Sequence, residues 1–259
     1  MRDVGLDEAI RVAGGIGALA RKIGISQPSV SNWSRVPAER VLSIEAATGV
    51  SRATLRPDLY AEHPGMAGDV DEVDAARAQE YALLSVLLAR TPAVGLLERL
   101  STLRGDASPL GLAHAALAEA AQCTSVERLE REYFDLFIGL GRGELLPYAS
   151  YYLTGFLHER PLARLRAHLV ELALERTPGQ AEPEDHAAIL CEIMAGLVSR
   201  RFPAPAGSDR ELFEAHLAPW IGRFFADLEQ AEAADFYRGV GRLGRVFVDI
   251  ETDAFALPS

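Results

Sequence analysis

Apolar residues recur every three to four positions along almost the whole chain, and no segment shows a sustained alternation of apolar and polar residues. A helix presents residues at that spacing on one face, whereas a half-buried strand needs a period of two. Ala, Leu, Glu and Arg are abundant, and these residues favour helix over strand. The sequence therefore predicts an all-α fold.

A stretch rich in helix breakers divides the chain. The segment RPDLYAEHPGMAGDVD, residues 56–71, holds two prolines and two glycines and shows little periodicity. Because 259 residues suffice for one small and one medium domain, we expect a head at 1–60, a linker at 61–75 and a body at 76–255. Helices of the body are expected to begin near Val73, Pro109, Ser125, Tyr148, Pro161, Pro183, Ser208 and Gln230.

The net charge of −11 is unevenly divided between these parts. Residues 1–60 hold eight Arg and Lys against six Asp and Glu, whereas the remaining residues hold 18 against 31. A body of charge −13 disfavours nucleic acid and favours basic partners. The head, at only +2, would bind DNA through local contacts and as a multimer, with a homodimer as one such form.

Two further features concern the cellular compartment. The first ten residues contain no apolar signal stretch, and no segment approaches the roughly 20 apolar residues that a membrane span needs. Cys123 and Cys191 lie far apart within helical patterns, so we interpret them as two buried, reduced thiols. These features predict a cytoplasmic protein without a membrane span.

The head has the layout of a helix-turn-helix. Gly14 and Gly15 separate a first helix from a second at 16–23, and Gly24 provides the turn that follows. Ser26 is placed to cap a third helix that begins at Gln27. A fourth helix is expected from about residue 37 to 48. In this motif the early residues of the second helix of the pair meet the bases of DNA.

Polar side chains on that helix suit DNA recognition, because amides and hydroxyls can pair with base edges and basic residues can bind phosphates. The expected base-reading residues are Gln27, Ser29, Ser31 and Asn32, and the expected phosphate contacts are Arg21, Lys22 and Arg35. Residues 6–60, including the run W-x-R-V-P-A-E-R, resemble the YdaS-like branch of the Cro-type helix-turn-helix proteins. The alternative is a helical module that has lost DNA binding and serves dimerisation or docking.

Three clusters mark the body. They are EYFDLFIG at 132–139 with PYASYY at 147–152, then EPEDH at 182–186, then HLAPWIGRF at 216–224. Each cluster also has a purely structural interpretation, as a helical core stripe, a helix start and a core pair respectively.

Together and in this order, the clusters resemble the TorD family of redox-enzyme maturation chaperones over about residues 76–252. The resemblance implies a TorD-like helical bundle that binds the twin-arginine leader of an apo-molybdoenzyme before its molybdenum cofactor is inserted. It carries the peptide-binding role to Tyr133, Phe137, Pro147, Tyr148, Ser150, Tyr151, Glu184, Asp185, His186 and Trp220. The stretch GLGRGELL and the N-terminal head both depart from the family pattern, so the identity of the client enzyme stays open.

The residue types agree with such a ligand. A leader with two arginines and an apolar stretch needs carboxylates for charge-assisted hydrogen bonds and an apolar groove for the remainder. Glu184 and Asp185 supply the carboxylates, and aromatic rings such as Tyr148 and Trp220 can stack on arginine. The acidic body would also attract a cationic peptide.

A catalytic function finds little support in the sequence. Glu184, Asp185 and His186 could act as acid and base, but no nucleophile elbow, P-loop or Rossmann glycine pattern is found, and the other histidines lack metal-binding spacing. We therefore expect no catalytic residue, no metal site and no cofactor bound by the chain itself. The alternative to a chaperone is a transcriptional regulator whose helical body senses a ligand or partner.

Overall fold

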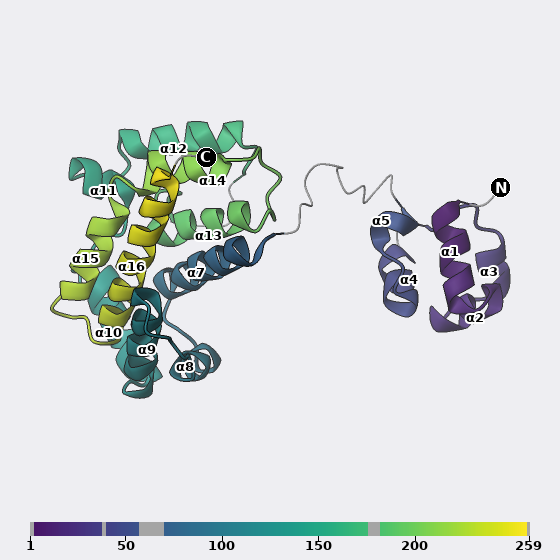
Figure 1. The fold of residues 1–259 in the computed structure, drawn as a ribbon, viewed down its shortest axis with the longest axis horizontal. Helices are drawn as coiled ribbons and strands as arrows, with labels where there is room; N and C mark the ends of the chain where they lie inside the picture. Colours follow the sequence, from purple (N-terminus) through teal and green to yellow (C-terminus); the bar gives the residue numbers. More distant parts are fainter. Residues whose placement is uncertain (1–2, 38–39, 57–69, 176–181, 258–259) are drawn as a thin grey trace. The chain divides into compact units, whose positions relative to one another are not determined.

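The structure is a computed structural model that describes residues 3–37, 40–56, 70–175 and 182–257. Its Cα positions divide the chain into two compact units, Met1–Asp69 and Val70–Ser259 (Figure 1). Within the described ranges there is no β-strand, only an isolated antiparallel bridge between Tyr148 and His186. The all-α prediction is confirmed.

The described residues of the first unit form the helices α1 Val4–Ala13, α2 Ile16–Lys22, α3 Gln27–Ser31, α4 Val41–Thr48 and α5 Arg52–Leu55 (Figure 1). Gly14 ends α1 in the left-handed conformation, with φ of 89°, and the Ser26 side chain accepts the Ser29 N–H at the start of α3. Both helix boundaries were expected from the sequence. The helix expected from about residue 37 to 48 corresponds to α4, whose regular α-helix starts at Val41 and ends at Thr48; residues 38–39 lie outside the described residues.

The core of the first unit is small and apolar. Leu6, Leu19, Val30 and Ile44, one from each of α1 to α4, are completely buried. The Arg56 guanidinium is also buried and donates to the Val36 carbonyl oxygen at 2.7 Å, so it holds the C-terminal end of α5 to the segment after α3. Such burial by several short helices stabilises helices that would be marginal in isolation.

The second unit contains longer helices and two π-helical turns. Its elements are α7 Glu72–Ala89, α8 Val94–Ser101, α9 Pro109–Gln122, α10 Val126–Tyr133, the π-helix η2 Phe134–Ile138, α11 Ala149–Thr154, α12 Arg160–Glu171, α13 Ala187–Val198, α14 Ser208–Leu212, the π-helix η3 Phe213–Leu217, α15 Ile221–Gln230 and α16 Phe236–Ala256. Helix α7 packs along α13, and α16 packs between α15 and α9 (Figure 1).

Several expected helix boundaries of the body differ in the structure. Helix α7 begins at Glu72, one residue before the predicted start near Val73 and inside the linker expected at 61–75, because the Asp71 side chain accepts the Asp74 N–H at 2.7 Å and caps the helix there. Residues 61–69 of the expected linker lie outside the described residues. The predicted helix starts at Pro183 and Gln230 were wrong: α13 starts at Ala187, and 230 ends α15. Helix α8 was not expected.

The core of the body is aromatic and closely packed. Tyr81, Phe213, Phe224 and Tyr237 are all buried below 2% exposure. Helices α15 and α16 approach closely at Gly244, where an added Cβ atom would lie 2.3 Å from the Phe225 ring. The prediction for the cysteines was half right, since Cys191 is buried and Cys123 is exposed.

A partly buried ion cluster around the buried Glu251 joins three helices of the body. Arg77 of α7 donates to both carboxylate oxygens of Glu251 in α16, at 2.7 and 2.8 Å, and to Asp209 of α14 at 3.2 Å. Tyr81 donates its hydroxyl to Glu251 at 2.9 Å. Hydrogen bonds to Glu251 and Asp74 and the charge of Asp209 raise the Arg77 pKa, although burial opposes that shift. This cluster fixes the C-terminal helix against the first helix of the body.

No described helix is long and apolar enough to cross a membrane.

Candidate functional site

The expected DNA-reading face of the head is exposed. Helix α3 buries Val30 completely, and Trp33, two residues after the end of the helix, packs against the same core, which leaves the other face of α3 to solvent. The exposed residues include all seven that were expected to contact DNA, namely Arg21, Lys22, Gln27, Ser29, Ser31, Asn32 and Arg35. Asn32 lies just beyond the helix as its C-cap. The helix is therefore short, and its polar side chains lie on the side away from the core.

In the body, Asp185 connects two segments of the expected peptide site. Its Oδ2 atom accepts the Ser150 N–H at 2.9 Å and the Ser150 hydroxyl at 2.5 Å, and its carbonyl oxygen accepts the Ala149 N–H at 3.0 Å. The Pro147 carbonyl oxygen accepts the Ala187 N–H at 2.8 Å. Asp185 is 1% exposed and Ser150 is 0% exposed. The carboxylate thus caps α11 from a position 35 residues away.

His186 and Tyr148 meet at the same junction. The His186 Nδ1 atom accepts the Ala188 N–H at 3.0 Å and so caps α13. Its ring contacts the Tyr148 ring edge-on, with centroids 5.0 Å apart. Burial lowers the pKa of His186 to about 4, so the ring is neutral at pH 7. Tyr148 donates its hydroxyl to Glu182 at 2.5 Å, and burial raises the pKa of this tyrosine.

Glu184 lies beside this junction but faces a different neighbour. Its Oε2 atom accepts two hydrogen bonds from Arg166 of α12, from Nε at 3.0 Å and from a terminal nitrogen at 2.8 Å. The Glu184 side chain is 11% exposed, whereas that of Arg166 is 50% exposed. Both residues line a groove of 580 Å³ between α12 and α13. Glu184 is therefore a carboxylate at a groove wall that already holds a guanidinium.

Tyr133 and Phe137 belong to an aromatic group at the start of α16. Their ring centroids lie 5.1 Å apart, and that of Phe137 lies 5.4 Å from that of Tyr237. The neighbouring Glu132 accepts the N–H groups of Asp235, Phe236 and Tyr237 at 2.7 to 3.2 Å. Burial raises the pKa of Glu132 despite these three donors. This part of the first cluster therefore anchors the last helix of the bundle.

Trp220 lies in the core. Its side chain is 2% exposed, and its Nε1 donates at 2.7 Å to the carbonyl oxygen of His216, which lies in the π-helix η3. Its ring centroid is 5.4 Å from that of Tyr152 and 6.0 Å from that of Phe224. A ligand that stacks on Trp220 would have to displace Tyr152.

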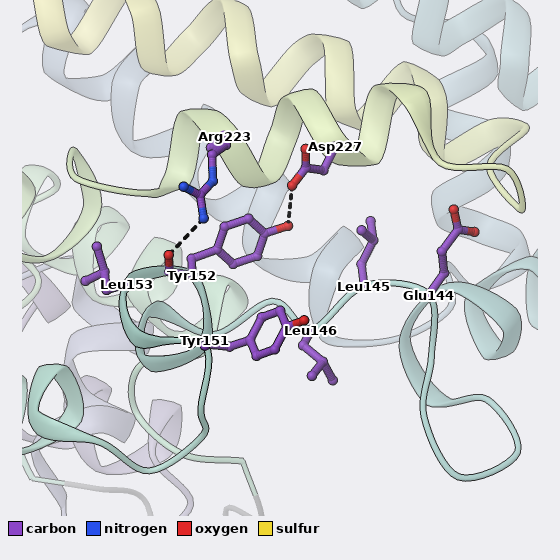
Figure 2. Close-up of a pocket in the computed structure, with 9 residues that line it drawn as sticks. Glu144, Leu145, Leu146, Tyr151, Tyr152, Leu153, Arg223 and Asp227 are labelled. Atoms are coloured by element: carbon purple, nitrogen blue, oxygen red, sulfur yellow. Dashed lines mark hydrogen bonds between the residues drawn. The ribbon is translucent and has the colours of Figure 1, made fainter.

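Figure 2 shows a polar pocket of 440 Å³ that includes Tyr151. One wall comes from α11, a second from α15 and a third from the stretch 144–146 that follows the GLGRG turn. Tyr152 donates its hydroxyl to Asp227 at 3.0 Å, and Arg223 donates to the Tyr152 carbonyl oxygen at 2.8 Å. Outside the pocket lining, Arg142 lies over the Tyr151 ring at 5.4 Å.

The ten expected peptide-binding residues do not share one surface. The junction of α11 and α13 unites Pro147, Tyr148, Ser150, Asp185 and His186, mostly buried. Of the others, Glu184 lies in the groove and Tyr151 in the polar pocket. Tyr133 and Phe137 belong to the aromatic group, and Trp220 lies in the core. Arg166 was not among the expected site residues, because it stands in an ordinary helical pattern and pairs with Glu184 across 18 residues. Among the described residues no group of three or more His, Cys, Asp or Glu could hold a metal ion.

Comparison with known families supports the two-part organisation. Residues 104–226 match the family model of the nitrate reductase delta subunit, and residues 6–64 match that of the bacterial toxin YdaS. The first match spans all three sequence clusters of the body, and the second spans the helix-turn-helix. The predicted resemblance of the head to YdaS and of the body to TorD-type proteins is confirmed.

Individual relatives of the body are chaperones. The chaperone protein TorD of Vibrio cholerae O1 El Tor is 28% identical over 129 residues, which cover 46% of this chain and 59% of that protein. TorD of Vibrio vulnificus YJ016 is 24% identical over 73% of this chain and 98% of that protein. A solved redox enzyme maturation protein from Archaeoglobus fulgidus is 20% identical, with a TM-score of 0.44 over 67% of this chain and 93% of that one. Both TorD relatives are named as chaperones.

Proposed function

We propose that the body is a chaperone that binds the twin-arginine leader of an apo-molybdoenzyme and holds the client until its molybdenum cofactor is inserted. The chain would act in the cytoplasm before the client is exported, and would bind no cofactor itself. The similarity to TorD chaperones supports this function, as does the net charge of −13 on residues 61–259.

The observation that carries the proposal is the pairing of Glu184 with a guanidinium at the wall of an apolar groove. A receptor for arginine needs a carboxylate that accepts more than one N–H, held in place by its surroundings. Glu184 meets that requirement, because it is mostly buried and still accepts two hydrogen bonds from Arg166. Asp185, Ser150 and His186 would act indirectly, because they hold in place the segment that carries Glu184.

A direct test is the titration of the full chain with a synthetic leader that carries two arginines before an apolar stretch. The matched peptide has two lysines in place of the arginines. Because lysine cannot form the planar two-donor contact that arginine forms, we expect the arginine peptide to bind at least tenfold more tightly. Equal binding of the two peptides, or binding of neither at high micromolar protein, would remove the leader from the proposal. A regulator whose body senses another ligand would then be the better account.

We propose a second function for the head, the recognition of DNA. It is supported by the match of residues 6–64 to the YdaS family and by the exposure of the polar face of α3. Selection of genomic fragments by the full chain should enrich one common site. A selection that enriches no site would favour the alternative, in which the head serves dimerisation or docking.

A further inference from the structure

The groove between α12 and α13 combines apolar walls with charged edges. Its apolar wall residues include Leu169, Val170, Leu174, Ile189, Ile193 and Phe202. Val170 of α12 is 75% exposed. The volume of 580 Å³ lies in the range of sites that hold several side chains of a ligand.

The charges at the groove define the chemistry of its occupant. Among the described residues that line it, Glu175, Glu184 and Glu192 stand against one basic residue, Arg166, so these four side chains carry a net charge of −2. Three carboxylates disfavour an anionic ligand such as a phosphate or an acidic lipid headgroup. A peptide with arginine next to apolar residues complements both the charge and the walls.

Arg166 already occupies the place that an arginine of such a peptide would take. Its Nε and one terminal nitrogen both donate to the same Glu184 oxygen, at 3.0 and 2.8 Å. Because half of the Arg166 side chain is exposed, it can move into water at little cost, whereas Glu184 is mostly buried and needs a cationic partner. The contact therefore joins a replaceable cation to a fixed carboxylate.

We propose that the groove between α12 and α13 receives the arginine and the adjoining apolar residues of the client leader, and that Arg166 is an internal competitor which the client arginine displaces from Glu184. This inference rests on the proposed function, to which it adds the location of the site and a built-in limit on affinity. A client without an arginine at that position gains nothing from Glu184, so the competition also helps the chain to distinguish leaders with this arginine from leaders without it.

The variant Arg166→Gln tests the competition. Removal of the competitor should tighten binding of the two-arginine peptide to the full chain by about three- to tenfold. The matched control is Arg160→Gln, which removes the same charge from the exposed first turn of the same helix. Because any lost positive charge attracts a cationic peptide more strongly, only a gain beyond that of the control supports the proposal. An equal gain, or weaker binding by Arg166→Gln, overturns the competition.

The variant Val170→Asn tests the groove. Loss of an apolar contact of this size should weaken binding of the same peptide by roughly tenfold. The control is Val73→Asn, because Val73 is another helical valine with 68% exposure and lies outside the groove. Equal affinities of the two variants would overturn the groove while leaving leader binding intact. If the unaltered chain binds neither the arginine nor the lysine peptide, the proposed function fails and this inference fails with it.

Discussion

Asp185 makes the contact that most clearly holds the body's candidate site together, so its replacement by Ala should destabilise the body. Helix α11 begins without a side-chain cap of its own, and the Asp185 carboxylate supplies that cap by accepting the N–H and hydroxyl of Ser150. A hydrogen bond to a charged group contributes about 1.5–3 kcal/mol, and removal of a helix cap costs up to about 2 kcal/mol. These contributions overlap, so we expect a loss of about 3 kcal/mol in the free energy of unfolding.

Differential scanning calorimetry of the full chain would measure this effect. For a unit of this size, about 3 kcal/mol corresponds to a fall of roughly 6–12 °C in the Tm of the body. Ser150→Ala loses only the hydroxyl contact and should cost about 1 kcal/mol. The control Asp249→Ala removes a carboxylate that is 68% exposed on α16 and should change the Tm little. If Asp185→Ala melts at the temperature of this control, Asp185 does not clamp α11 to α13 and the reasoning is refuted.

Three further predictions concern the core, the pH dependence and the head. Arg77→Gln leaves Glu251 buried without its main partner, so it should lower the free energy of unfolding in chemical denaturation by about 3–5 kcal/mol. Arg128→Gln breaks only a surface pair and should lower it by less than about 1 kcal/mol. Because the pKa of His186 is lowered to about 4 from 6.5, its contribution to stability is complete above pH 6.5 and is lost as pH falls toward 4. The free energy of unfolding in urea should therefore differ less between pH 7 and pH 5 for His186→Asn than for the unaltered chain. Equal differences for the two proteins would contradict the lowered pKa of His186. Asn32→Ala should weaken the free energy of binding to the selected DNA site by about 1–3 kcal/mol and leave binding to unrelated DNA unchanged, as measured by fluorescence anisotropy. Equal losses of binding on both DNAs would mean that Asn32 reads no base.

Local signals in the sequence predicted much of the fold correctly. The helical period gave the all-α class, and the end of α1 at Gly14 and the cap of α3 at Ser26 depend only on residues within one turn. The error at the start of α13 has a local cause as well. Pro183 is typical of a first helical turn, but here it belongs to a turn that ends at His186, the residue that caps the helix.

The arrangement of the candidate site depends on contacts between distant parts of the chain, which one sequence does not reveal. The motifs around Tyr148 and Asp185 were recognised as a set, yet their pairing across 35 residues became visible only in the structure. Glu132 caps α16 from about 100 residues away, and Arg166 reaches Glu184 from a neighbouring helix. Acidic and aromatic residues that looked available for a ligand are partly used to hold the bundle together.

The central claim, that the body receives an arginine-bearing leader between α12 and α13, can be tested by hydrogen exchange of the full chain with and without the two-arginine peptide. The account predicts slower exchange of backbone amides in α12 and α13, no change in the helices of the head, and no protection by the two-lysine peptide. Protection confined to the head, or none in α12 and α13 under conditions where the peptide binds, would contradict it.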